Sequence, residues 1–229
     1  MKLRTISAAI VAAMSLCSCT ALWRLGEKTV EAASSDRGRI LLLADSTQIE
    51  GRMDLPAPDR AQVSVKPRKG KMLRLQADSI ETLHIWQKKH PENSYCLVWR
   101  SYIDPADSVG GVKPCGPCWM CCRAAGRHLA IYTRCDTWEF SSSGMLHFQA
   151  KREGRIVYIA FKPEYATGMV IGNAKDGRAA LARNLLRFCA DDPDFCRRLA
   201  GGEIDPVDFR QVVDAYDPSA AVRFDDYSI

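Results

Sequence analysis

Short segments of alternating apolar and polar residues recur along the middle of this chain, and turn-forming residues separate them. The pattern predicts one hairpin from residues 40–43 and 48–55, and a second from 62–66 and 73–76. Further strands are expected at residues 83–86, 95–102, 120–125, 128–134, 145–150 and 156–161. The middle of the protein is therefore expected to be antiparallel sheet.

The end of the chain carries helix signals instead. The apolar residues that share one face of the first expected helix are Leu181, Leu185, Phe188 and Cys189. A second helix is expected to begin with Asp192 as its cap and Pro193 at its first position, and Asp205 and Pro206 predict the same start for a third. The fold class is therefore expected to be α+β, an antiparallel β-rich body of hairpins or a meander followed by three short C-terminal helices.

The first residues have the three parts of an export signal. Lys2 and Arg4 supply positive charge, and residues 6–16 form an apolar run that is shorter than the roughly 20 residues needed to cross a bilayer. The run ends in the sequence LCSC at residues 16–19, which resembles a bacterial lipobox, with Cys19 as the residue that takes the lipid. We therefore expect cleavage after Ser18 and lipidation of Cys19. An ordinary secretory signal cut nearby is the alternative.

A lipidated Cys19 predicts a membrane-anchored protein without a transmembrane helix, because two or three acyl chains such as palmitate hold more firmly than one. Thr20 follows the cysteine, where an aspartate would resemble an inner-membrane retention signal. We therefore expect an outer-membrane protein whose body faces the periplasm. Residues 20–37 are expected to be a solvated spacer, with a short helix lying on the lipid as the alternative.

Composition adds limits on size and partners. Removing the leader lowers the formal charge from +5 to about +3, which does not indicate a nucleic-acid partner. The segments expected from the chain are a signal peptide (1–18), a lipidated cysteine and tether (19–37), a β-rich body (38–172) with a cysteine-rich loop (115–122), a helical unit (173–217) and a tail (218–229). The body is long enough to bury a core.

Three stretches resemble a set of uncharacterised exported proteins of Bacteroidetes-type bacteria. They are RILLLADSTQIEGRMDLP at residues 39–56, ADSIETLHIWQKKHPE at 77–92, and RAALARNLLRFCADDPDFCRRLAGGEIDPVDFRQVVDAYD at 178–217. The resemblance implies export and a shared architecture. It implies no activity, assigns no site residue, and does not include the cysteine-rich segment.

Eight cysteines follow the leader and permit three kinds of chemistry. They are Cys96, Cys115, Cys118, Cys121, Cys122, Cys135, Cys189 and Cys196. The sequence CGPC at residues 115–118 looks like the active-site tetrapeptide of thioredoxins, but no βαβ pattern surrounds it. Cys115, Cys118 and Cys121 have the spacing of a zinc knuckle, which Cys122, His128 or Cys135 would complete.

The third kind of chemistry is a disulfide framework. If Gly126 and Arg127 form a two-residue turn with glycine first, Ala125 faces His128, and Cys118 then falls opposite Cys135. We therefore predict a disulfide between Cys118 and Cys135. Cys189 and Cys196 are expected to pack as small apolar residues near a helix junction, and a bridge between them, if the chain bends at Pro193, is the alternative.

Other chemistry-bearing residues form no known catalytic pattern. The four histidines match no metalloprotease or hydrolase motif, so each is expected to be a strand or turn residue. A basic hairpin end would suit anionic lipid or polysaccharide, or would simply keep a sheet edge soluble; its residues are Lys66, Arg68, Lys69, Lys71 and Arg74. The sequence thus predicts a non-enzymatic structural or interaction lipoprotein without a cofactor, which meets an envelope protein or another envelope component. The alternative is a metal-binding or thiol-redox protein centred on residues 115–122.

Overall fold

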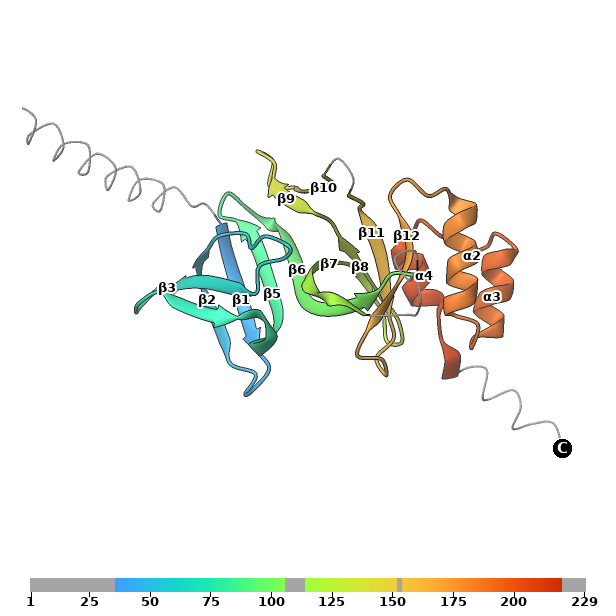
Figure 1. Cartoon of the computed structure of the whole chain (residues 1–229), viewed down its shortest axis with the longest axis horizontal. Helices are drawn as coiled ribbons and strands as arrows, with labels where there is room; N and C mark the ends of the chain where they lie inside the picture. The colour runs from blue at the N-terminus through green and yellow to red at the C-terminus, as the bar shows by residue number, and fades with distance from the viewer. Residues whose placement is uncertain (1–35, 106–113, 152–153, 220–229) are drawn as a thin grey trace, which may run out of the picture. The chain divides into compact units, whose positions relative to one another are not determined.

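A long, mostly antiparallel sheet followed by three helices makes up the part of the chain that the computed structural model describes, residues 36–105, 114–151 and 154–219 (Figure 1). The expected α+β architecture is confirmed. The strands are β1 (Asp36–Leu42), β2 (Gln48–Met53), β3 (Gln62–Pro67), β4 (Leu73–Gln76), β5 (Ile80–Gln87), β6 (His90–Ile103), β7 (Pro114–Ala125), β8 (Ala130–Arg134), β9 (Thr137–Phe140), β10 (Leu146–Gln149), β11 (Val157–Phe161) and β12 (Gly168–Asn173). The helices are α2 (Arg178–Phe188), α3 (Pro193–Ala200) and α4 (Phe209–Ala215), with a 3-10 turn, η1, at Ala77–Ser79.

The strand order of the main sheet is β12-β11-β8-β7-β6-β5-β1-β2-β3-β4, and the two hairpins expected from residues 40–55 and 62–76 are β1–β2 and β3–β4. All these neighbours are antiparallel, but β12 also pairs in parallel with β6, where Gly168 faces Tyr102 and Met169 faces Ile103. Strands β6, β7, β8, β11 and β12 therefore close into a ring. Strands β9 and β10 form a separate two-stranded sheet.

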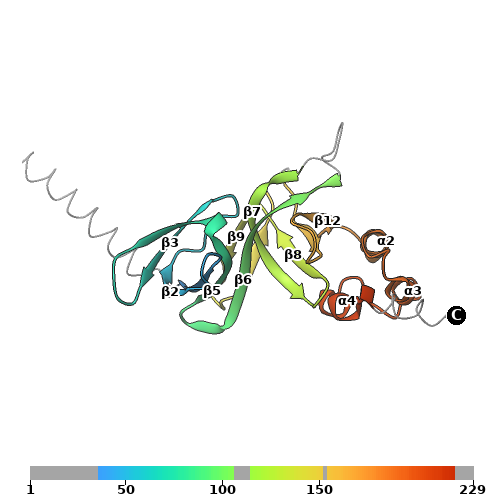
Figure 2. The same ribbon diagram turned by 90° about the horizontal axis from the view of Figure 1, so that it is seen from below.

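Strand β6 belongs to both halves of the main sheet (Figure 2). At Leu97 it pairs with β5 on one edge and with β7 on the other. Farther along, β7 still occupies the second edge, so the parallel pairing with β12 must use the edge that β5 has left. One edge of β6 thus pairs with β5 near its start and with β12 near its end. This change of partner divides the sheet into an open part, which continues from β6 through β5 to β4, and the ring.

Apolar side chains fill three clusters that match this division. The open part covers one cluster, which includes Ile40, Val65 and Leu83. The ring encloses a second cluster, to which β11 contributes Val157, Ile159 and Phe161. Side chains at alternate positions of β11, Tyr158 and Ala160, belong to the third cluster with the helices, as the two-residue period of a strand requires.

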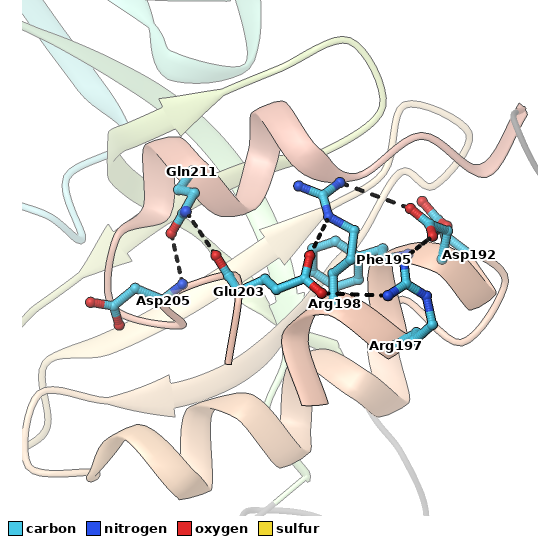
Figure 3. A network of polar contacts seen from close by, with 8 residues as sticks. Asp192, Phe195, Arg197, Arg198, Glu203, Asp205 and Gln211 are labelled. Atoms are coloured by element: carbon cyan, nitrogen blue, oxygen red, sulfur yellow. Dashed lines mark hydrogen bonds and ion pairs between the residues drawn. The ribbon is translucent and has the colours of Figure 1, made fainter. Parts of the chain in front are cut away.

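The helices pack on the ring through their apolar faces. Helix α2 contacts β12 and buries Leu181 and Leu185, and α4 contacts β7 and β8. Helix α3 begins as expected, since the carboxylate of Asp192 accepts a hydrogen bond from the Phe195 N–H at 2.9 Å and Pro193 follows the cap (Figure 3).

The expected start of the third helix was wrong. Helix α4 begins at Phe209, and Asp208 caps it by accepting from the N–H groups of Arg210 and Gln211, each at 3.1 Å. The carboxylate of Asp205 instead accepts from the Val207 N–H at 3.1 Å and pairs with Arg178. Because its side chain closes a turn, Asp205 is not available as a cap.

Strand β12 was not predicted, because Gly168 and Gly172 weaken the strand pattern. A Cβ at Gly168 would lie 2.4 Å from Cε2 of Phe161, and one at Gly172 would lie 2.4 Å from Cδ2 of Leu181. Both glycines therefore permit close packing, one towards the inside of the ring and one towards α2.

The expected signal peptide, the lipidation at Cys19, residues 19–35 of the tether and most of the tail lie outside the described residues. The expected end of the tether at residue 37 was wrong, because β1 begins at Asp36. Within residues 36–105, 114–151 and 154–219, no helix combines the length and the hydropathy of a membrane-spanning segment.

Candidate functional sites

The cysteine-rich segment 115–122, expected as a loop, lies on strand β7. Its pairing with β6 shifts between Cys115, which faces Tyr102, and Cys118, which faces Arg100. Gly116 and Pro117 therefore lie opposite Ser101 alone, which is a β-bulge. A bulge accommodates a proline in a strand because that position needs no ladder N–H.

Strand geometry separates the cysteines. Cys118 packs in the ring cluster and Cys121 in the cluster under the open part of the sheet, while Cys122 is only partly buried. In the part of the chain that the structure describes, no three His, Cys, Asp or Glu side chains gather so that they could hold a metal ion. The geometry therefore gives no support to a metal site made by Cys115, Cys118, Cys121 and Cys135.

Burial makes the β7 thiols poor nucleophiles. It raises the pKa of Cys118 to about 11, although the nearby Arg134 favours the thiolate, and it raises the pKa of Cys121 to about 12. Burial also raises the pKa values of Cys96, on β6, and Cys135, which follows β8, to about 11. A redox-active CxxC pair needs a lowered thiol pKa, commonly supplied by a helix N-terminus, whereas this sequence lies on a strand.

The turn after β7 differs from the predicted two-residue turn. Gly126 donates its N–H to the Leu129 carbonyl at 2.8 Å, and Ala125 faces Ala130 instead of His128. A type II′ turn needs a positive φ at its first central residue, and Gly126 does not have one. The glycine serves packing instead, since a Cβ there would lie 2.6 Å from the Val213 carbonyl oxygen of α4.

The register that suggested the Cys118–Cys135 disulfide was therefore wrong. Arg123 adds a further bulge, because Cys122 faces Tyr132 while Ala124 faces Ile131. All eight cysteines of the described residues are free thiols, and the Cys135 thiol donates to the Thr137 carbonyl at 3.1 Å. Cys118 is nevertheless among the groups whose charge raises the pKa of Cys135. The two thiols pack in different apolar clusters, and a bond between them stays a prediction.

Cys189 and Cys196 lie near the α2–α3 junction. Cys189 is fully buried in the cluster beneath the helices, which confirms the apolar packing expected for it. The partly buried Cys196 donates its thiol to the Cys189 carbonyl at 3.3 Å.

A buried lysine that the sequence did not reveal joins β11 to the helices. Lys162 is 5% exposed, and its Nζ lies 2.8 Å from both carboxylate oxygens of Asp191. The Tyr216 hydroxyl donates to Asp191 at 2.7 Å, and the Lys162 ammonium lies 5.1 Å and 5.2 Å from the Phe188 and Tyr216 ring centroids. These contacts link the end of β11, the α2–α3 region and the residue after α4, so the cluster stabilises the packing of the helices on the sheet.

The ionisation of this cluster follows from its hydrogen bonds. Desolvation opposes the charged form of Asp191, but the hydrogen bonds from Lys162 and Tyr216 outweigh it together, and the pKa of the carboxyl is lowered. Burial and then the bond to Asp191 raise the pKa of Tyr216. The Asp191 carboxyl is therefore ionised at neutral pH.

A cavity of about 270 Å³ lies between β12 and α2. Its polar residues bind mainly one another: Arg155 pairs with Asp104 at 2.9 Å, and Asn173 donates to Asp176 at 2.8 Å. Asn184 donates to the Ile171 carbonyl at 3.0 Å. These bonds join the residues that line the cavity to one another, which indicates that their role is to stabilise the fold. Only the spacing of Asn173 and Asp176, which is typical of a turn, pointed to it in the sequence.

Comparisons of the chain with protein-family models, with curated proteins and with solved structures found no match. The resemblance to exported Bacteroidetes-type proteins therefore stays a prediction, and the function must be argued from the residues.

Proposed function

We propose that this protein is a lipoprotein of the bacterial cell envelope, anchored through Cys19, and that its sheet is a non-enzymatic interaction module. The carrying observation is the order of the first residues, in which a positive start and a short apolar run end in LCSC at residues 16–19. Anchoring in the outer membrane with the body in the periplasm, and contact with an envelope protein or another envelope component, are parts of the same proposal.

The state of the thiols supports an interaction role over cysteine chemistry. Cys118, Cys121 and Cys135 are buried, and burial raises the pKa of each. Trp119 and Trp138 also serve the fold, since their indole N–H groups donate to the carbonyls of Arg60 and Pro56 at 2.9 Å and 2.6 Å. These two tryptophans hold the segment between β2 and β3 against the sheet.

The anchor is tested by the intact mass of the protein purified from its own envelope. We expect a chain that begins at Cys19 and carries the mass of acyl chains. We expect Cys19→Ser to remove that acyl mass. Cys17→Ser is the matched control and should leave the lipid in place, because Cys17 occupies the unconstrained position of the motif. A wild-type chain without acyl mass would refute the anchor.

Thiol labelling tests the non-enzymatic reading. In the native protein, Cys118, Cys121, Cys135 and Cys189 should react slowly, and denaturation without reductant should expose them. If Cys118 and Cys135 form a disulfide, both stay unlabelled after denaturation, and Cys135→Ser releases one new thiol at Cys118. Rapid native labelling of Cys115 and Cys118 as a pair, or co-purified zinc, would favour the cysteine-dependent alternative.

A further inference from the structure

The solvent-facing side of the open sheet carries three cations that face one another across neighbouring strands. Arg37 of β1 faces Arg52 of β2, and Arg52 faces Lys66 of β3. Residues paired across strands point to the same side of a sheet. The opposite side is the core, because Ile40, Met53 and Val65 lie at positions of the other parity and are almost fully buried.

Acidic partners do not neutralise this row. Among the described residues, none of Arg37, Arg52 and Lys66 forms an ion pair. The neighbouring Glu50 pairs with Arg39 at 3.3 Å. Like charges directly opposite one another destabilise a sheet, so three adjacent cations lower stability unless an anion binds them.

The row continues into the β3–β4 hairpin, so that the cations extend from the sheet to its last strand. The exposed cations of the hairpin are Arg68, Lys69, Lys71 and Arg74. Together with Arg37, Arg52 and Lys66 they define the cationic face. His84 faces Arg39 and lies on the same side of the sheet. Partial burial and then the charge of Arg39 lower the pKa of His84, so a further positive charge is disfavoured on this side.

One exposed apolar side chain stands among these cations at the hairpin end. Met72, which precedes β4, is 48% exposed. The next residue, Leu73, faces Val65 and therefore points to the core side. A soluble polyanion, such as a charged polysaccharide, would leave Met72 in water. A lipid bilayer offers phosphate for the cations and an apolar interior for the methionine, so the combination favours a membrane.

The proposed anchor places such a surface within reach. The chain between Cys19 and Asp36 spans at most about 60 Å when fully extended, whatever its conformation. We propose that the cationic face docks on the anionic phospholipid surface of the membrane, with Met72 entering the headgroup region. The inference rests on the proposed function, whose envelope component it specifies as anionic lipid.

The test uses vesicles and a chain without lipid. The chain from Thr20 to Ile229 contains the whole compact unit Asp36–Ile229 and carries neither leader nor Cys19. Its binding is measured by co-sedimentation with vesicles of phosphatidylglycerol and phosphatidylethanolamine, and with neutral phosphatidylcholine vesicles. We expect binding to the anionic vesicles alone, and we expect salt to weaken it.

Two variants locate the binding surface. The combined change Arg37→Gln, Arg52→Gln and Lys66→Gln should lower the partition coefficient at least tenfold, since each cation near an anionic surface contributes roughly a fivefold factor. The change Met72→Ser should weaken binding without altering charge. The matched control Arg197→Gln, Arg198→Gln and Arg210→Gln removes the same charge from α3 and α4 and should change binding less than twofold. Circular dichroism verifies that each variant is folded.

The outcomes separate this inference from the anchor. The docking proposal is overturned if anionic vesicles do not bind, if the control loses as much binding as the cationic-face variant, or if Met72→Ser has no effect while soluble polyphosphate competes fully. The last result would assign the cationic face to a soluble polyanion. Because this chain has no lipid, none of these results bears on acylation of Cys19, which the intact mass tests alone.

Discussion

Lys162 shows how much one side chain contributes to joining the helices to the sheet. Its Nζ is almost fully buried, yet it meets both oxygens of Asp191 and two aromatic rings. Sequence patterns did not reveal it, because a single lysine after an apolar strand is usually read as the end of that strand. Its partners are Phe188 at the end of α2, Asp191 between α2 and α3, and Tyr216 directly after α4, and only the folded chain brings them together.

We predict that Lys162→Met lowers the free energy of unfolding by about 1–2 kcal/mol at neutral pH. The value is modest because the Asp191 side chain is 46% exposed, so water screens the pair. The surface change Lys175→Met is the control and should have little effect. Urea unfolding of both variants measures the difference.

The same pair predicts a pH dependence. The pKa of folded Asp191 is lowered from its ordinary value of 3.8, so the contribution of the pair is fully present above that value and is lost as pH falls through the lower folded pKa. The stability difference between wild type and Lys162→Met should therefore narrow below about pH 4. A difference that stays constant down to strong acid would contradict the role given to Asp191.

The two helix caps should differ in strength. Asp192 is 3% exposed, and besides capping α3 it accepts from the Asp217 N–H at 2.8 Å. Both carboxylates accept from two N–H groups, but those of Asp192 are buried or partly buried and those of Asp208 are exposed to water. Asp192→Ala should therefore cost about 2–3 kcal/mol, whereas Asp208→Ala should cost about 1 kcal/mol. Thermal unfolding of the two variants tests the order, and equal losses would show that burial of the Asp192 bonds adds nothing.

At the level of elements, the expected strands and helices agree with the structure where a pattern is local. The first two hairpins and the capped start of α3 needed only alternation, turn residues and an Asp-Pro pair. The third helix was misplaced because two aspartates lie close together, and only the hydrogen bonds distinguish the turn at Asp205 from the cap at Asp208. Strand β12 and the turn after β7 were missed because Gly168 and Gly126 are required by close packing against residues distant in sequence, Phe161 and Val213.

Glycine positions give an element-scale prediction. Gly126→Ala should destabilise the protein by about 1–3 kcal/mol, since the new Cβ would collide with the backbone of α4. Gly116→Ala is the matched control on the neighbouring strand, because a Cβ there has no atom within 4 Å. Denaturant midpoints compare the two, and equal effects would mean that α4 is not held against this turn.

For the candidate site, the sequence could name the cysteines but could not place them. Strand β7 distributes Cys118 and Cys121 between two cores, and two bulges change which residues face them. Bulges follow from tertiary contacts and leave little trace in a sequence. The cationic face was foreseen only at the β3–β4 hairpin, because Arg37 was assigned to the expected tether and the register that places it opposite Arg52 was not predicted.

At the level of the whole molecule, the open part of the sheet and the ring share β6, and β7 contributes side chains to the cores of both. Neither part can lose its strands without exposing the core of the other, so we predict that they unfold in one transition. Tryptophan fluorescence reports on Trp86, Trp99, Trp119 and Trp138 in β5, β6, β7 and β9, while far-ultraviolet circular dichroism also reports on the helices. The two denaturation curves should coincide. Separate midpoints would show that the helices and the ring form an independent unit.

The parallel pairing of β12 with β6 also governs the order of assembly. Tyr102 and Ile103 cannot find their partners until the intervening residues 104–167 have been synthesised, so the ring closes late and through contacts distant in sequence. Until then the edges of β6 and β11 are open to strands of other chains, a route to aggregation. We therefore expect refolding to be slow, and its yield to fall as the protein concentration rises, because the sheet joins to itself through its last strand.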